Sequence, residues 1–195
     1  MEYFIGIIIA YFLGSVPMGL ILTRMAGKGD LRKVGSGNIG ATNVMRVGGL
    51  RMAGLVWILD MAKAIAAVFI GKYIAGDAFA AWCGLAAIVG HCYPIWLRFR
   101  GGKGISSLFG VLLAISPLSF AVCGVEWLLV ALGTGISSAG AMVVFCLIPI
   151  LGFVIGGGVG WPFLGIGLLC MWRHRENIRR LAGGTESKIE WKWKK

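Results

Sequence analysis

The sequence predicts an all-α polytopic membrane protein with seven transmembrane helices, five being the alternative, an outside N-terminus and a cytoplasmic C-terminus. Two observations predict this class. Hydrophobic residues make up 58% of the 195-residue chain and charged residues only 14%, which is too little polar surface to coat a water-exposed globule. The basic residues, which give a net charge of +11, gather in three segments between long apolar runs. The length fits a single domain, residues 1–195.

The first three apolar runs predict three spans. The run at 3–23 is long enough to cross a bilayer core about 30 Å thick, and Pro17 predicts a kink within it. Its acidic start does not resemble the basic start of a signal peptide, so we interpret it as a retained span. The runs at 52–75 and 78–97 follow a polar stretch, and a short turn around Gly76 separates them.

The two remaining runs leave the number of spans open. Residues 105–132 contain Ser116–Pro117, and residues 139–172 contain GGGVGWP. If each run is one helix, the chain has five spans; if each is a hairpin, it has seven. A single helix over 139–172 would be about 51 Å long, which favours seven. Only the seven-span layout places residues 133–138 on the same side as the basic segments.

The basic residues predict the orientation. Seventeen of the 19 lie in residues 24–51, 98–104 and 173–195. Because cytoplasmic loops collect Lys and Arg, these segments are expected inside and the N-terminus outside. The charge is therefore explained by membrane topology, and nucleic acid is not an expected partner.

Polar residues inside the apolar runs are expected to be structural. Asp60 and Lys63 lie one helical turn apart and are expected to pair with each other. His91 is expected to hydrogen-bond across a helix contact, and Glu126 has no predicted partner. No metal or cofactor motif is present. The five cysteines are expected to be small buried side chains: Cys83, Cys92, Cys123, Cys146 and Cys170.

The first basic segment contains GSGNIGATNVMRVGG, residues 35–49. Its GxGxxG pattern lacks the βαβ unit that dinucleotide binding requires. Glycines nevertheless let backbone N–H groups approach an anion, and the fork of an arginine matches phosphate. We predict an anion site, the alternative being a turn-rich connecting loop. Its candidate residues are Gly35, Ser36, Gly37, Asn38, Thr42, Asn43 and Arg46.

The other two basic segments add further candidates. GHCYPIWLRFRGGKG, residues 90–104, presents Lys103 in a glycine-rich turn, either as a phosphate ligand or as an ordinary positive anchor. In RHRENIRRL, residues 173–181, helical spacing puts His174 and Asn177 on one face, the alternative being a lipid-binding surface helix. Glu176 is expected to pair with one of the neighbouring arginines: Arg173, Arg179 or Arg180.

Taken together, these segments resemble the acyl-phosphate-dependent glycerol-3-phosphate acyltransferases of bacterial inner membranes. GSGNIGATNVMRVGG, GHCYPIWLRFRGGKG and RHRENIRRLAGGTESK match three ordered family motifs. The chain departs from the family where Ile105-Ser106-Ser107 replaces the frequent Val-Ala-Thr, and at Thr134-Gly135, where a basic residue and Tyr are usual. Ser137 matches the family's serine, with Ser138 the alternative.

The resemblance implies a multi-pass inner-membrane enzyme with its active site on the cytoplasmic side. It implies transfer of an acyl chain from acyl phosphate to the sn-1 hydroxyl of glycerol 3-phosphate, without a cofactor and among membrane lipids. The base is either His174 or a substrate phosphate. The implied catalytic residues are Ser36, Arg46, Lys103, His174 and Asn177. The implied substrate-binding residues are Gly35, Gly37, Asn38, Thr42, Asn43, Gly101, Gly102, Gly104 and Ser137.

Two other classes of function share some of these features. A transporter for an organic phosphate would also need an anion site, but no internal repeat is visible in the sequence. A lipid-binding scaffold would use only the basic tail.

Overall fold

The computed structural model describes residues 1–189, and within them the protein is a bundle of α-helices without a strand. The all-α prediction is confirmed. The helices are α1 (Glu2–Ser15), α2 (Met18–Met25), α3 (Ala41–Cys92), α4 (Ile105–Ile115), α5 (Pro117–Thr134), α6 (Ser137–Ile155), α7 (Gly160–Arg173) and α8 (Arg175–Ala182). Two short 3-10 turns, η1 (Leu31–Lys33) and η2 (Ile95–Leu97), lie in the connections.

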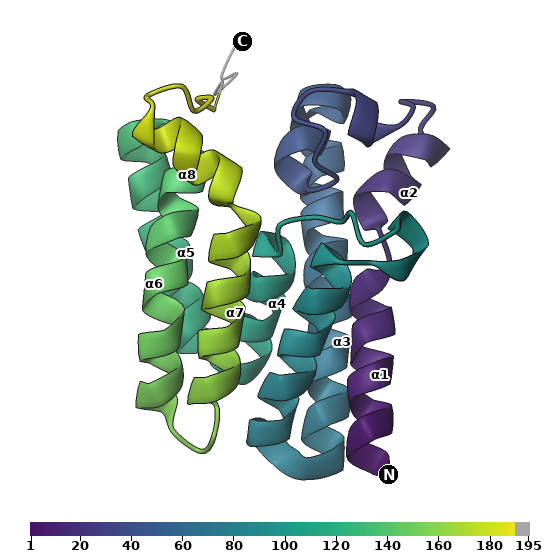
Figure 1. Ribbon diagram of the computed structural model, residues 1–195, viewed down its shortest axis with the longest axis vertical. Coiled ribbons are helices and arrows are strands. Elements are labelled where there is room, and N and C mark those ends of the chain that lie inside the picture. Colours follow the sequence, from purple (N-terminus) through teal and green to yellow (C-terminus); the bar gives the residue numbers. More distant parts are fainter. Residues whose placement is uncertain (190–195) are drawn as a thin grey trace.

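Helix α3 reverses direction within its length and forms two arms. Ala75 and Gly76 leave the helical region, and Gly76 has a φ of 73°, which a glycine adopts without steric cost. We call residues 41–74 the first arm and residues 77–92 the second arm; Figure 1 shows them side by side. The turn predicted around Gly76 is confirmed. The helix begins earlier than the predicted apolar run, at Ala41, but Gly49, with a φ of 82°, leaves the helical region, so residues 41–48 form a short helical stretch that a kink separates from the rest of the first arm.

Proline and glycine interrupt the other apolar runs where the sequence predicts breaks. The first run breaks at Val16, just before Pro17, and separates α1 from α2. Ser116 divides α4 from α5, and its Oγ accepts a hydrogen bond from Ser119 N at 3.2 Å, which caps the new helix. Residues 156–159 divide α6 from α7. These breaks arise because proline lacks a backbone N–H and glycine tolerates turn conformations.

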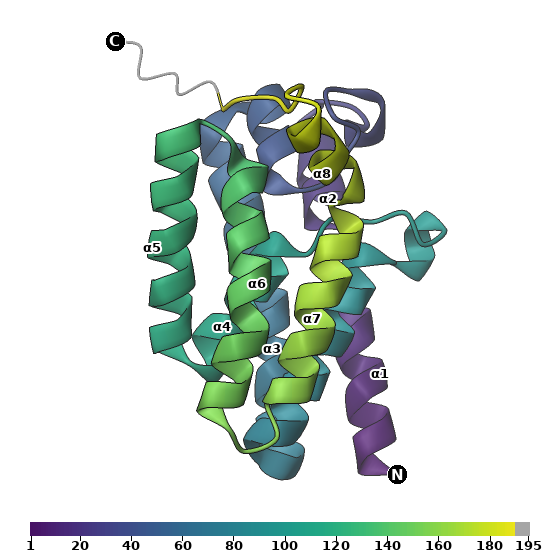
Figure 2. The same ribbon diagram turned by 60° about the vertical axis from the view of Figure 1, so that its left-hand side comes forward.

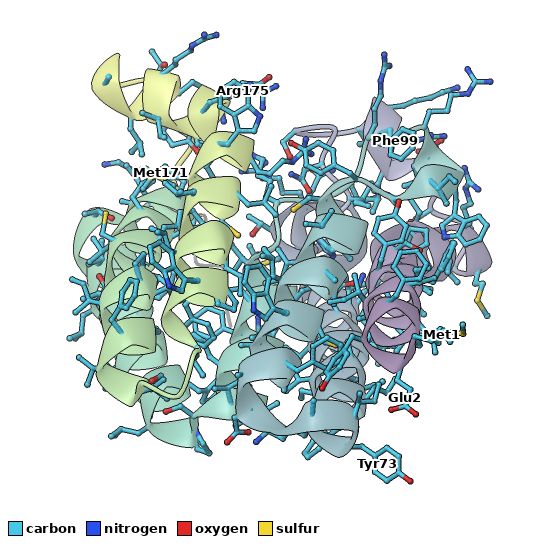
Figure 3. The ribbon with its side chains drawn as sticks, turned by 60° about the horizontal axis from the view of Figure 1, so that its bottom comes forward. Met1, Glu2, Tyr73, Phe99, Met171 and Arg175 are labelled. Atoms are coloured by element: carbon cyan, nitrogen blue, oxygen red, sulfur yellow. The ribbon has the colours of Figure 1, made fainter. Side chains whose placement is uncertain are left out.

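The two ends of the bundle differ in character. In Figure 1 the N-terminus lies at one end, whereas α8 and the connection between α2 and α3 lie at the other. Figure 3 shows Tyr73 and Glu2 toward the first end and Phe99 and Arg175 toward the second. Gly135 also lies at the second end, because its carbonyl accepts a hydrogen bond from Ile189 N at 2.7 Å. This shared end is the arrangement that a seven-span layout requires.

Several helices are long and apolar enough to cross a membrane. By length and composition, four helical stretches of the described chain qualify, at 2–25, 41–97, 117–134 and 137–155. The outer surface carries large apolar side chains, which suits contact with lipid tails. Helices approach closely where glycines remove side chains: a Cβ on Gly14 would lie 1.9 Å from Ala87 O, and one on Gly90 would lie 2.1 Å from Tyr11 O. These contacts fix α1 against the second arm of α3.

The polar residues of the apolar runs behave largely as predicted. Lys63 Nζ lies 2.7 Å from Asp60 Oδ1, so the expected pair is confirmed, and His91 joins it. The carboxyl oxygens of Glu126 have no hydrogen-bond partner among the described residues. Four cysteines are buried, but Cys146 is exposed, which corrects the prediction for that residue. It lies on the outside of α6, where an apolar thiol side chain can face lipid.

Candidate active site

Residues 101–104, which we call the glycine strap, cross the second end of the bundle in a fixed path. The N–H groups of Gly101 and Gly102 donate to the carbonyls of Cys92 (3.1 Å) and His91 (3.0 Å), at the end of α3. The carbonyls of the same two glycines accept from Arg173, at 2.9 and 3.0 Å. Gly104 has a φ of 89°, a left-handed conformation that glycine favours, and starts α4. The strap is therefore held from both sides, and it presents Lys103.

The connection between η1 and α3 is shaped by a buried amide. Asn43 Nδ2 donates to three backbone carbonyls, and Asn43 Oδ1 accepts from Ser36 N at 3.0 Å. Asn38 Oδ1 accepts from Gly40 N at 2.8 Å. A Cβ on Gly35 would lie 2.3 Å from Asn43 Oδ1, so the chain passes too close for any other residue. The side chains of Asn38 and Asn43 are thus used within the loop itself.

This loop leaves three polar side chains exposed. Ser36 and Thr42 are exposed, and no hydrogen bond of the Ser36 hydroxyl is found within residues 1–189. Arg46 lies in the first turns of α3 and donates to Ser187 Oγ at 2.9 Å. Gly37 turns the chain with a φ of 69° just after Ser36. The loop therefore offers an exposed hydroxyl and an exposed guanidinium beside a rigid glycine turn.

His174 and Asn177 share one face of the α7–α8 junction, as the helical spacing predicts, and both are buried. His174 Nδ1 lies 2.8 Å from the carbonyl of Cys170, so the hydrogen-bond network assigns the proton to Nδ1 and leaves Nε2 as an acceptor. Burial lowers the pKa of His174 to about 4 despite the bond to Cys170. The imidazole is therefore neutral near pH 7.

Asn177 connects the third motif to the second. Its Oδ1 accepts a hydrogen bond from Lys103 Nζ, and its Nδ2 donates to Glu186 Oε1 at 2.6 Å. Burial lowers the pKa of Lys103, with a further contribution from the positive charge of Arg180. The ammonium is thus held close to neighbouring cations in a partly dehydrated place, which favours the arrival of an anion.

Glu186 is a member of this network that sequence reasoning missed. It accepts hydrogen bonds from Ser138 Oγ (2.9 Å), Asn177 Nδ2 (2.6 Å) and Arg180 Nε (2.6 Å). Burial alone would raise the pKa of Glu186, but the three hydrogen bonds outweigh it, and the pKa is lowered. The feature of the sequence that could have pointed to Glu186 is its place as an acid within a strongly basic tail.

Glu176 does not have the predicted role. It is exposed and forms no ion pair among residues 1–189, and Arg180 pairs with Glu186 instead. The prediction considered only helical neighbours, whereas the tail folds back beyond α8 and supplies a better placed carboxylate.

The two candidate serines at the start of α6 differ in their contacts. Ser138 is buried and donates to Glu186. Ser137 is half-buried, and its backbone carbonyl accepts from Trp127 Nε1 at 3.2 Å. The structure therefore connects Ser138, rather than Ser137, to the polar network.

The network joins segments that are far apart in the sequence. Hydrogen bonds link Lys103 to Asn177, Asn177 to Glu186, and Arg46 to Ser187, the residue next to Glu186. In Figure 2 the α8 segment lies over the end of the bundle that carries these loops. Among residues 1–189, four cationic side chains and one carboxylate, that of Glu186, take part, so this part of the chain has a surplus of positive charge that suits phosphate groups. The cations are Arg46, Lys103, Arg173 and Arg180.

Comparisons with a family model, with related sequences and with solved structures all point to the same family. Residues 4–184 match the model of the family described as glycerol-3-phosphate acyltransferase. The chain is 45% identical over 183 residues to a glycerol-3-phosphate acyltransferase of Rhizobium etli, covering 93% of this chain and 89% of that protein. It is also 45% identical over 183 residues to the protein of the same name from Agrobacterium fabrum, with the same coverage.

Two solved structures are similar over almost the whole fold. Both are crystal structures of PlsY (YgiH), an integral membrane glycerol 3-phosphate acyltransferase. The glycerol 3-phosphate form superposes with a TM-score of 0.91 at 35% identity, covering 97% of this chain and 96% of that one. The lysophosphatidic acid form gives a TM-score of 0.90 at 34% identity, with the same coverage.

Proposed function

The chain belongs to the glycerol-3-phosphate acyltransferase family, and from this premise we propose that it acylates the sn-1 hydroxyl of glycerol 3-phosphate with an acyl phosphate as donor. The products would be lysophosphatidic acid and inorganic phosphate, in phospholipid biosynthesis. The hydroxyl oxygen forms a bond to the acyl carbon, and the bond between that carbon and the phosphate oxygen breaks. The observation that carries the proposal is the hydrogen-bonded network that joins the strap, the α7–α8 junction and Glu186, with Arg46 bonded to the next residue of the chain, Ser187.

The cations of the network suit two phosphate-bearing substrates. Lys103 is the cation of the glycine strap, and Arg46 lies in the first turns of α3, so each is a candidate ligand for a phosphate. The Ser36 hydroxyl and the strap glycines, Gly101, Gly102 and Gly104, are candidates for closer contact with the donor. Binding two anions side by side is costly in a neutral site and favourable where cations are in surplus. Catalysis then rests on orientation and on stabilising the charge that develops on the acyl oxygen.

The proton of the attacking hydroxyl has two possible acceptors. Neutral His174 offers Nε2, and its low pKa makes it a weak base near neutral pH. A substrate phosphate, which keeps basic oxygens at that pH, can accept the proton while His174 orients the hydroxyl. The leaving phosphate is a good leaving group, so a covalent acyl-enzyme is not required.

We place the site at the cytoplasmic face of a bacterial inner membrane. Seven helical segments, counting the two arms of α3, would then cross the bilayer, with α4 and α7 as short spans. Within residues 1–189, the basic segments and the site share one end of the bundle, and the positive-inside bias assigns that end to the cytoplasm and the N-terminus to the outside. The whole chain would act as one domain, among membrane lipids and without a cofactor.

The test uses purified protein in detergent with acyl phosphate and glycerol 3-phosphate. Phosphate release and lysophosphatidic acid are followed together, with acyl-CoA as the comparison donor. Acceptor-dependent release of both products in equal amounts supports the proposal. Phosphate release that does not depend on glycerol 3-phosphate, or transfer from acyl-CoA alone, would count against it. Uptake of glycerol 3-phosphate by vesicles without lysophosphatidic acid would favour a transporter.

A further inference from the structure

A buried charged cluster lies directly behind the glycine strap. Lys63 Nζ is 2.7 Å from Asp60 Oδ1, 3.1 Å from His91 Nδ1, and 2.8 Å from the carbonyl of Val16. The exposed fractions of Asp60, Lys63 and His91 are 2%, 6% and 5%. The cluster joins the end of α1 to both arms of α3. Removing one member would leave a buried charge without its partner, which is strongly unfavourable.

The imidazole of His91 connects this cluster to the strap. His91 Nδ1 lies 3.1 Å from Lys63 Nζ and 3.6 Å from Asp60 Oδ1. Because the nearer neighbour, the ammonium, only donates, Nδ1 is assigned as the acceptor and the ring proton to Nε2. That edge faces Gly102: a Cβ built on Gly102 would lie 2.0 Å from Nε2, and its three nearest atoms all belong to the His91 ring. The His91 carbonyl also accepts the Gly102 N–H at 3.0 Å.

The neighbouring glycine lies against different atoms. A Cβ on Gly101 would lie 2.2 Å from His91 O, 2.4 Å from Pro94 Cδ and 2.8 Å from Cys92 O, which are backbone or proline atoms. Truncating the His91 side chain would therefore make room at Gly102 and none at Gly101. Helix packing alone explains the Asp60–Lys63 pair, but it gives no reason for the imidazole to lie against the strap.

We propose that His91, oriented by Lys63 and Asp60, is a positioning residue that sets the path of the glycine strap and thereby the place of Lys103. The proposal rests on the proposed function in one respect, namely that Lys103 binds a substrate phosphate. Asp60 and Lys63 act through His91 and touch no substrate. The strap is then held at four points: two backbone carbonyls of α3, the guanidinium of Arg173, and the imidazole edge.

The experiment compares Gly102→Ala in the wild-type and His91→Ala backgrounds, in the full-length protein, with the assay described above. In the wild-type background the added methyl meets the imidazole and displaces Lys103. We expect kcat/KM to fall about ten- to a hundredfold, the value of one charge-assisted hydrogen bond to phosphate, mostly through KM for a phosphate-bearing substrate. In the His91→Ala background, Gly102→Ala is expected to lower kcat/KM by less than about threefold.

The matched control is Gly101→Ala, which is expected to cost the same in both backgrounds. The proposal is overturned if Gly102→Ala lowers kcat/KM by the same factor in the wild-type and His91→Ala backgrounds. It is also overturned if His91→Ala restores the kcat/KM of Gly101→Ala as much as that of Gly102→Ala. If wild-type protein makes no lysophosphatidic acid, the proposed function fails. Thermal unfolding of the same variants then still tests the contact between Gly102 and the His91 ring. A smaller drop of the unfolding midpoint on Gly102→Ala in the His91→Ala background supports the contact, and an equal drop in both backgrounds overturns it.

A second variant covers the case in which His91→Ala does not fold. Asp60→Asn keeps the size of the side chain but removes the charge that balances Lys63, so the imidazole loses its fixed orientation. We expect KM for a phosphate-bearing substrate to rise about tenfold, with kcat changed less. Glu126→Gln, which neutralises another intramembrane acid on α5, is the control and is expected to leave KM unchanged. An unchanged KM in Asp60→Asn would overturn the role of the cluster.

Discussion

Arg173→Ala is the sharpest test of how the strap is held. The guanidinium donates to the carbonyls of Gly101 and Gly102 at 2.9 and 3.0 Å, and it lies 4.9 Å from the centre of the Tyr93 ring. Each hydrogen bond from a charged donor contributes about 1.5–3 kcal/mol, and a cation–π contact at a partly exposed site contributes about 0.5–1 kcal/mol. Because Arg173 is half-buried, solvent reduces the sum, and we expect the variant to lose about 2–4 kcal/mol of stability.

The same change should reduce activity through the position of Lys103. The strap keeps the two hydrogen bonds from its N–H groups to α3 but loses both bonds at its carbonyls. We expect kcat/KM to fall about thirtyfold, which corresponds to about 2 kcal/mol of transition-state stabilisation. Arg173→Lys can reach one carbonyl at a time and should fall between the wild type and the alanine variant.

The control is Arg175→Ala, two residues along the chain. Arg175 has a similar set of contacts, with a hydrogen bond to Trp172 O at 3.3 Å and its guanidinium 5.1 Å from the Trp172 ring, but it does not reach the strap. Steady-state kinetics and thermal unfolding in detergent are measured for all three variants. Activity of Arg173→Ala within about threefold of wild type, or an equal loss in Arg175→Ala, would refute the reasoning.

Three further predictions concern the rest of the site. Arg46→Ala should lower kcat/KM by about a hundredfold with an unchanged unfolding midpoint, because the exposed guanidinium makes a single hydrogen bond within residues 1–189, to Ser187 Oγ; a lower midpoint would point to a structural role. With a pKa of about 4, His174 stays neutral down to about pH 5, so its own protonation should lower kcat only as the pH drops toward 4; a fall with a half-point near about 6 that persists in His174→Gln would assign the proton to a substrate phosphate, and one that His174→Gln abolishes would contradict the assigned burial. The thiol of Ser138→Cys should resist a membrane-impermeant reagent in right-side-out vesicles until the vesicles are opened. The protein in the intact and in the opened vesicles also carries serine in place of exposed Cys146, and labelling from outside would defeat the seven-span layout.

The sequence predicts the helical segments well because their determinants are local. A stretch of apolar residues long enough to cross a bilayer, a proline at position 17 or 117, and glycines at 76 and 156–158 act on the chain wherever it lies. The clustering of basic residues at one end is likewise a property of the chain. The three motif segments could therefore be identified, and the structure brings parts of all three into one polar network.

Contacts between distant segments were not predictable in the same way. Nothing in the chain around Glu186 indicates that it accepts a hydrogen bond from Ser138, 48 positions away. Asn43 was assigned to substrate, but its amide is used by the backbone of its own loop. Glu176 was expected to pair with a helical neighbour, and the folded tail supplied another carboxylate to Arg180. Each of these depends on which atoms meet after the helices pack.

By itself, the sequence determined that this protein is an apolar helical bundle with its positive charge at one end and three glycine- and donor-rich segments there. Hydropathy and backbone conformation are properties of short stretches, so they can be read along the chain. Only the tertiary structure decided that Lys103, Asn177, Glu186 and Ser138 form one network, and that the imidazole of His91 lies behind the strap. Those contacts come from helices that are distant in sequence, and close packing of small residues sets their distances.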